Sequence, residues 1–164
     1  MRVVIIGVLV IVVVSVGAYL FAASLPAEVQ ASRTRTINAP VDRVFALVTN
    51  VADQPRWRQD VASVTVADDG RRWTEQTKQG IAISFEETGR VPLQRFEIAF
   101  SSPQGFTGVW VGEFAPTAQG QTEVTFTETI RTESPIGRLM QRIFAPPGAH
   151  IELYLRDLEA AAAA

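Results

Sequence analysis

The sequence of 164 residues has no cysteine and only one histidine, His150. Without cysteine, disulfides, thiol catalysis and lipoprotein acylation are excluded, and one histidine cannot build a multi-histidine metal site. The chain also lacks an excess of basic residues, since 15 Lys and Arg stand against 17 Asp and Glu. A nucleic-acid-binding protein usually carries such an excess. No glycine-rich phosphate loop is present either. We therefore expect no metal, no cofactor and no nucleic-acid partner.

What the sequence does have is one long apolar run, Val3 to Ala23, which contains no charged residue. As a helix these residues would extend roughly 31 Å, which is close to the hydrocarbon thickness of a bilayer. The run predicts a single transmembrane anchor over residues 1–24, followed by a linker over residues 25–31. A cleaved signal peptide is the alternative, because FAASLPA (21–27) offers small residues to a peptidase, but the run is too long for one.

The charges that flank the apolar run give opposing signals for membrane orientation. Arg2 and the α-amine favour a cytoplasmic amino terminus, whereas Arg33, Arg35 and Arg43 follow the run closely and favour a cytoplasmic domain. We expect a single-pass membrane protein, and the balance leans slightly to an exported (periplasmic or extracellular) domain.

Residues 32–161 are long enough for one domain and too short for two. Ser32 to Asn38 alternates as an edge strand does, and Pro40 begins a helix that ends near Asn50. Six further strand-like stretches are separated by short turn signals, which predicts hairpins and an antiparallel sheet. These stretches are 62–67, 72–78, 81–90, 93–101, 106–114 and 122–132.

The carboxy-terminal part predicts helix again, beginning at Ser134 and Pro135. The motif APPG (145–148) must break or kink this helix, because proline lacks the amide hydrogen and clashes with the preceding turn. Two readings of the break stay open: a rigid kink that fits the helix to the sheet, or a hinge that swings 135–145 towards a membrane. Apolar residues form one stripe on each side of the break: Ile136, Leu139, Met140, Ile143 and Phe144 before it, and Ile151, Tyr154, Leu155 and Leu158 after it.

The first of these stripes carries Arg138 and Arg142 and no acidic residue beside it. A basic amphipathic helix of this kind can lie on an anionic membrane surface. The alternative, which we favour, is that the stripe closes the domain and the arginines face water.

Three segments resemble one family: TINAPVDRVFALVTNVADQPRWRQDVASVTV (36–66), GVWVGEFAPTAQGQTEVTFTETI (108–130) and LRDLEAA (155–161). Together with the order of elements over residues 32–160, they resemble the SRPBCC (START-like, polyketide cyclase/dehydrase) superfamily. The resemblance implies an α+β helix-grip fold. In that fold a curved antiparallel sheet of about seven strands wraps around a long C-terminal helix and leaves an apolar cavity between them. The anchor and the APPG break depart from the family pattern.

Alternation in the strands places three carboxylates, Glu75, Glu87 and Glu128, on the apolar face. A carboxylate in an apolar pocket has a raised pKa and can act as a general acid or base, so these are weak catalytic candidates. A bulge or an arginine partner would remove that role. His150 is interpreted as a surface residue. The candidate ligand contacts are Trp73, Phe85, Glu87, Trp110, Phe126, Glu128, Met140 and Phe144.

We therefore expect a membrane-tethered protein that binds or carries a lipophilic small molecule or lipid in an apolar cavity. A cyclase or dehydratase that uses the cavity carboxylates is the alternative, as is a non-catalytic interaction module with a filled core. The sequence favours a binding protein over an enzyme. The ligand and the oligomeric state are left open by the sequence.

Overall fold

The computed structural model describes residues 2–164, and it describes side chains from Val12 onward. The described residues form four α-helices, one 3-10 helix (η1) and seven strands. Their bounds are α1 Arg2–Ser24, β1 Glu28–Ile37, α2 Val41–Thr49, η1 Val51–Arg56, β2 Val61–Val66, β3 Arg72–Thr77, β4 Ala82–Val91, β5 Arg95–Ser102, β6 Phe106–Pro116, β7 Thr122–Thr132, α3 Pro135–Phe144 and α4 Ala149–Ala163.

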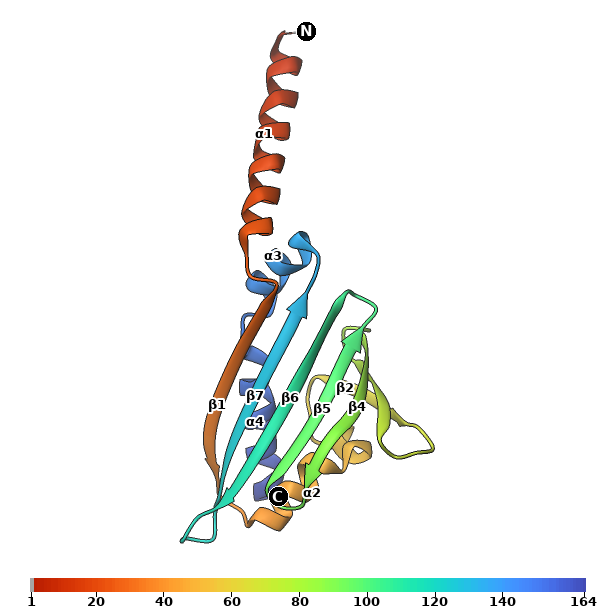
Figure 1. Ribbon diagram of the computed structural model, residues 1–164, viewed down its shortest axis with the longest axis vertical. Helices are drawn as coiled ribbons and strands as arrows, with labels where there is room; N and C mark the ends of the chain where they lie inside the picture. Colours follow the sequence, from red (N-terminus) through yellow and green to blue (C-terminus); the bar gives the residue numbers. More distant parts are fainter. Residues whose placement is uncertain (1) are drawn as a thin grey trace.

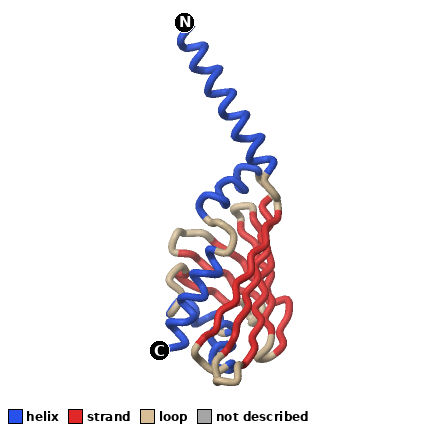
Figure 2. Tube along the Cα trace, turned by 90° about the vertical axis from the view of Figure 1, so that its left-hand side faces the viewer, coloured by secondary structure: helices blue, strands red, loops and turns tan. Residues whose placement is uncertain are grey.

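The seven strands form one antiparallel sheet in the order β1-β7-β6-β5-β4-β3-β2. Strands β2 to β7 pair with their neighbours in sequence, whereas β1 pairs with the last strand, from Glu28 opposite Arg131 to Ile37 opposite Thr122. Strand β1 begins four residues before its expected start. The sheet curves around α4 and α2, which cover one of its faces (Figures 1 and 2). This arrangement confirms the predicted α+β helix-grip fold.

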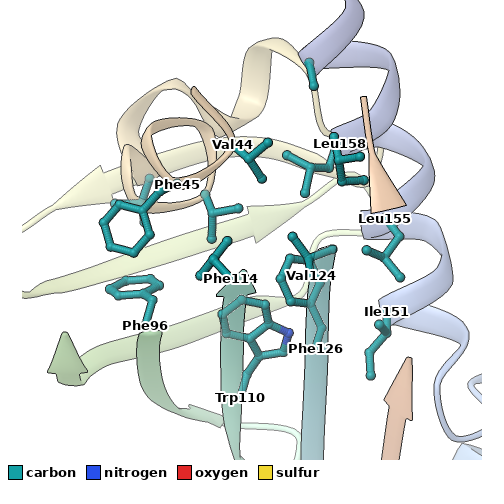
Figure 3. Close-up of a cluster of buried hydrophobic side chains, with 14 of the residues drawn as sticks. Val44, Phe45, Phe96, Trp110, Phe114, Val124, Phe126, Ile151, Leu155 and Leu158 are labelled. Atoms are coloured by element: carbon teal, nitrogen blue, oxygen red, sulfur yellow. The ribbon is translucent and has the colours of Figure 1, made fainter. Parts of the chain in front are cut away.

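The core lies between the sheet and the helices α2 and α4. Helix α2 buries Val44, Phe45 and Val48, which are spaced so that they share one face of the helix. Aromatic rings from the sheet complete this layer (Figure 3): Phe114 packs edge-on against Phe45 with ring centroids 5.2 Å apart, and Trp110 lies 4.7 Å from Phe126. Edge-to-face and tilted packing of this kind is favourable because the ring edge is positive and the ring face is negative.

The carboxy-terminal helix is broken where the two prolines predict it. Gly148 takes a left-handed conformation (φ 83°) and begins α4, and a methyl group added there would lie 2.8 Å from a guanidinium nitrogen of Arg33 on β1. Helix α4 buries the apolar side chains Ile151, Leu155 and Leu158 against the sheet. Helix α3 instead lies at the end of the domain where α1 leaves it (Figure 1). The break therefore packs directly against β1.

Helix α1 extends away from the domain (Figures 1 and 2). Within the described part of the chain, no helix is both long enough and apolar enough to cross a membrane. The transmembrane prediction for Val3 to Ala23 rests in part on residues 1–11, whose side chains lie outside the described residues.

Candidate functional site

The face of the sheet that turns towards α4 is not completely covered. Five large apolar side chains on this face are half-buried at the border of the core. We call this set the concave surface: Ile83, Phe85, Ile98, Phe106 and Ile130. Because the sheet alternates its side chains, the same face also carries the buried Phe100 and Trp110. The concave surface is thus an extension of the core that remains open to solvent.

The strand register places all three predicted carboxylates on this face. Glu75 lies opposite Ile83, Glu87 opposite Ile98 and Glu128 opposite Trp110. Directly opposite residues of antiparallel strands point to the same side of a sheet. The period of two in the sequence was therefore sufficient to locate these groups, although their surroundings differ.

Glu75 is fully occupied by a buried polar cluster. The guanidinium of Arg58 donates from Nη1 to both carboxylate oxygens of Glu75 at 3.1 and 3.0 Å, and Trp73 Nε1 donates to Glu75 at 3.3 Å. Burial raises the pKa of Glu75, because desolvation outweighs the charge of Arg58. Glu75 is only 3% exposed, so this carboxylate stabilises the fold and is closed to a ligand.

The same guanidinium has most of its donors satisfied. Arg58 also donates to both oxygens of Asp60, at 3.3 and 2.9 Å, and to Oε1 of Gln54 at 2.8 Å. The guanidinium carbon Cζ of Arg58 lies 5.2 Å from the ring centre of Tyr154 on α4, which places the cation against that ring. Arg58 therefore ties η1 and the start of β2 to β3 and α4, and it has little capacity left for an anionic ligand.

Glu87 is paired with a neighbouring arginine. Arg90 donates to its carboxylate at 2.6 and 3.1 Å, across a register shift between Glu87 and Gly89. The side chain of Arg90 is 39% exposed, so this pair lies at the rim of the concave surface.

Glu128 differs from the other two carboxylates. Among the described residues it has no hydrogen-bond or ion-pair partner, and burial raises its pKa, with only the charge of His150 acting in the opposite direction. It lies on β7 next to the half-buried Ile130 and opposite the ring of Trp110. A half-buried carboxyl group of this kind accepts a hydrogen bond when ionised and donates one when protonated. Glu128 is therefore the one predicted carboxylate that is free to serve a ligand.

Glu128→Gln is expected to raise the melting temperature at pH 7. The folded pKa of Glu128 is raised, so its favourable contribution is complete below the unfolded pKa of about 4.3 and is lost as pH rises through the folded pKa. The amide removes the cost of a partly desolvated charge at neutral pH and changes little near pH 4. Differential scanning calorimetry at both pH values measures this, with Glu123→Gln, exposed on the same strand, as the control. A melting temperature that falls at pH 7 would contradict the assignment.

The remaining predicted ligand contacts divide into three groups. Trp73, Trp110 and Phe126 are core residues, at 4%, 8% and 0% exposure. Phe85 is half-buried on the concave surface, where its ring stacks 5.4 Å from that of Trp73. Met140 and Phe144 lie on α3 and are 48% and 74% exposed. The structure does not bring these two together with the others, because the break at Pro146 and Pro147 turns α3 towards α1 instead of over the sheet.

Sequence reasoning did not find Arg58 or the role of Tyr154. Arg58 follows a short 3-10 helix, where no periodic pattern shows which way a side chain points. The available signal was indirect: Glu75 shares a face with Trp73 and is buried, and a buried carboxylate requires a cationic or hydrogen-bonding partner.

A separate hollow of about 560 Å³ lies over strands β2 to β5. Most of its lining residues, including Thr65, Thr74, Ser84 and Ser101, alternate with core residues and therefore point to the outer face of the sheet. All four are exposed or half-buried, and the charged side chains of Arg72 and Glu86 line the same hollow.

Comparison with known structures reveals the same fold in several proteins. Zhui aromatase/cyclase from Streptomyces sp. R1128 matches with a TM-score of 0.73 and 11% identity, over 83% of this chain and 94% of that chain. A START superfamily protein from Mycobacterium smegmatis matches with a TM-score of 0.62 and 14% identity, over 82% and 97%. Protein Mll3558 from Rhizobium loti matches with a TM-score of 0.59 and 23% identity, over 81% and 96%.

At these identities the structural matches establish a shared fold only. No curated protein sequence matches the chain significantly. A sequence model described as polyketide cyclase / dehydrase and lipid transport matches residues 28–161, which covers β1 to α4 almost completely. The chain therefore belongs to the polyketide cyclase/dehydrase and lipid transport family.

Proposed function

We propose that this protein binds and carries a lipophilic small molecule on the concave surface. The observation that carries the proposal is the combination of five half-buried apolar side chains with one carboxyl group, Glu128, that has no protein partner among the described residues. Removing apolar surface from water is favourable by about 25 cal/mol per Å². A ligand that covers these residues gains that energy without first unfolding any part of the domain.

Glu128 adds selectivity for the polar part of the ligand. A partly desolvated carboxyl group that lacks a partner favours a ligand with one hydroxyl, carbonyl or amine group placed to bond with it. Arg58 and Glu75 bond to each other at 3.0 and 3.1 Å, so neither offers the ligand a free charge. The preferred ligand class is a mostly apolar molecule with a single hydrogen-bonding group.

The proposal includes a membrane tether through α1. Its support is the uncharged run from Val3 to Ala23 and the exposure of apolar side chains in the described part of the helix, such as Leu20 at 63% and Phe21 at 57%. A tether keeps the domain close to lipophilic molecules in the bilayer, so that weak affinity is sufficient. We place the domain on the exported side, because Arg2 directly before the run favours a cytoplasmic amino terminus.

Ile98→Gln is expected to weaken binding of a neutral lipophilic probe by tenfold or more. The substitution places an amide at the centre of the concave surface, and an unsatisfied buried amide costs about 1–3 kcal/mol, of which about 1.4 kcal/mol corresponds to tenfold. The probe is N-phenyl-1-naphthylamine, whose fluorescence rises in apolar surroundings. It is titrated into the full-length chain in a mild non-ionic detergent, and native mass spectrometry of the same sample detects lipids that co-purify.

The matched control is Val109→Gln, because Val109 lies on β6, is 44% exposed and points to the outer face. Its affinity for the probe is expected to stay within about twofold of the parent chain. Equal losses in the two variants, or clean protein that binds no probe, would contradict the proposal and favour an interaction module with a filled core.

Glu128 also supports a second candidate function, a cyclase or dehydratase. A half-buried carboxyl group with a raised pKa can transfer a proton to or from a ligand held beside it. The shared fold with an aromatase/cyclase is compatible with this chemistry. The same variant separates the two functions, since Glu128→Gln abolishes turnover in an enzyme and only changes the affinity of a carrier.

A further inference from the structure

Helix α3 presents an uncovered apolar face. Four of its large side chains are exposed: Ile136 at 61%, Met140 at 48%, Ile143 at 59% and Phe144 at 74%. We call these four residues the α3 stripe. None of the helix's residues is buried. Contiguous exposed apolar patches on folded proteins mark interaction sites.

The α3 stripe is exposed because the opposite side of the helix is fastened to the domain. Arg138 donates to three backbone carbonyls: Thr132 at 2.9 Å, Glu133 at 2.8 Å and Leu25 at 3.1 Å. Thr132 Oγ1 also donates to Gln141 Oε1 at 2.9 Å. Because Leu25 directly follows α1, these bonds hold α3 beside the end of that helix, and they point its polar side inward.

The charges around the stripe indicate what it contacts. Helix α3 has no acidic residue, and Arg142 is exposed and forms no ion pair with any described residue. On the neighbouring α1, Tyr19, Leu20 and Phe21 are also exposed, at 53%, 63% and 57%. The stripe therefore matches the acyl layer of a bilayer, and Arg142, on the polar side of α3 roughly 100° around the helix from Ile143, lies within the range of the negative potential of anionic headgroups.

We propose that α3 docks flat on an anionic lipid surface, with the α3 stripe in the acyl boundary and Arg142 in the negative potential of the headgroups. The docking deepens the proposed function, because it rests on the tether through α1 to bring α3 to the bilayer. No swing of α3 is needed, since the stripe already faces away from the sheet and the break at Gly148 packs against Arg33. Docking fixes the orientation of the domain over the lipid from which it takes its ligand.

The absence of cysteine allows a direct test with one fluorescent label. The full-length chain carrying Ile143→Cys is labelled with the environment-sensitive dye NBD and added to phosphatidylcholine vesicles, with or without phosphatidylglycerol. On the anionic vesicles we expect a blue shift of the NBD emission and quenching by spin-labelled lipid. Adding Arg142→Gln is expected to lower the docked-to-undocked ratio about fivefold, because each surface arginine contributes about that factor.

The control label is Gln119→Cys, in the β6–β7 turn at the end of the domain farthest from α1 (Figure 1). Its emission is expected to stay that of a dye in water. The proposal is overturned if the label at 143 also stays in water on vesicles, if neutral and anionic vesicles shift it equally, or if the shift depends on protein concentration without lipid. A carbonate wash tests the tether separately: release of the chain, with the shift at 143 present before the wash, contradicts only the insertion of α1.

Discussion

Arg58→Met is expected to lower the free energy of unfolding by about 3–5 kcal/mol, because it leaves Glu75 buried without its cationic partner. The side chain of Glu75 is 4% exposed and that of Arg58 13%, so neither group can turn to water in the folded state. The substitution also removes the hydrogen bonds that join Gln54 and Asp60 to this cluster. Urea unfolding of the full-length chain, followed by tryptophan fluorescence, measures the effect, since all three tryptophans lie outside α1.

The control is Arg72→Met, which removes an arginine from an exposed pair with Asp69 at 2.7 Å. We expect a loss of less than about 1 kcal/mol there, because surface ion pairs contribute little. The two variants also differ with pH. Without Arg58 the pKa of Glu75 rises further, so the variant keeps its stability below about pH 4.3 and loses it as pH rises. A loss in Arg58→Met that is equal at acidic and neutral pH would argue against a buried pair.

Phe126→Ala is expected to destabilise the domain by about 3–5 kcal/mol through loss of burial and the cavity that remains. Phe126 is 0% exposed, and its ring lies 4.7 Å from that of Trp110 and 5.6 Å from that of Tyr154. The same unfolding experiment measures the loss. Because Trp110 loses a direct neighbour, its fluorescence in the folded state is also expected to change.

Phe144→Ala provides the comparison for this second variant. The same side chain is removed at a position that is 74% exposed, so the free energy of unfolding is expected to stay within about 0.5 kcal/mol. If instead Phe144→Ala costs as much as Phe126→Ala, then α3 packs against the domain through the α3 stripe, and both the described fold and the docking proposal need revision.

The fold could be predicted from the sequence wherever a periodic run of apolar residues was bounded by a turn signal. The pattern from 106 to 114 became β6, and Pro146 and Pro147 separated two helices as their chemistry requires. The ends of the strands did not follow from the pattern. Alternation predicts that Leu93 belongs to a strand, whereas Leu93 lies in a turn with φ 62°. A leucine in the left-handed region gives no signal in an alternating pattern, so this turn could not be predicted.

The candidate site could be predicted only in part, for a related reason. Alternation located Glu75, Glu87 and Glu128 on one face. It could not show that Arg58 and Arg90 neutralise two of them, or that Glu128 has no such partner in the described part of the chain. Those pairings depend on a 3-10 turn and a register shift, neither of which has a period. Likewise the stripe on α3 showed an apolar face but not the direction in which it points.

The pairing of β1 with β7 has a consequence for synthesis of the chain. Strand β1 is made first after α1, but every backbone partner it has in the sheet belongs to β7, and 85 residues separate Ile37 from Thr122. At roughly 5–20 residues per second, the ribosome needs on the order of 4–17 s to supply those partners. During that interval β2 to β6 can form their hairpins in order, while β1 waits as an unpaired edge. Closure of the sheet is thus a late, long-range event, which is the slow class of folding step.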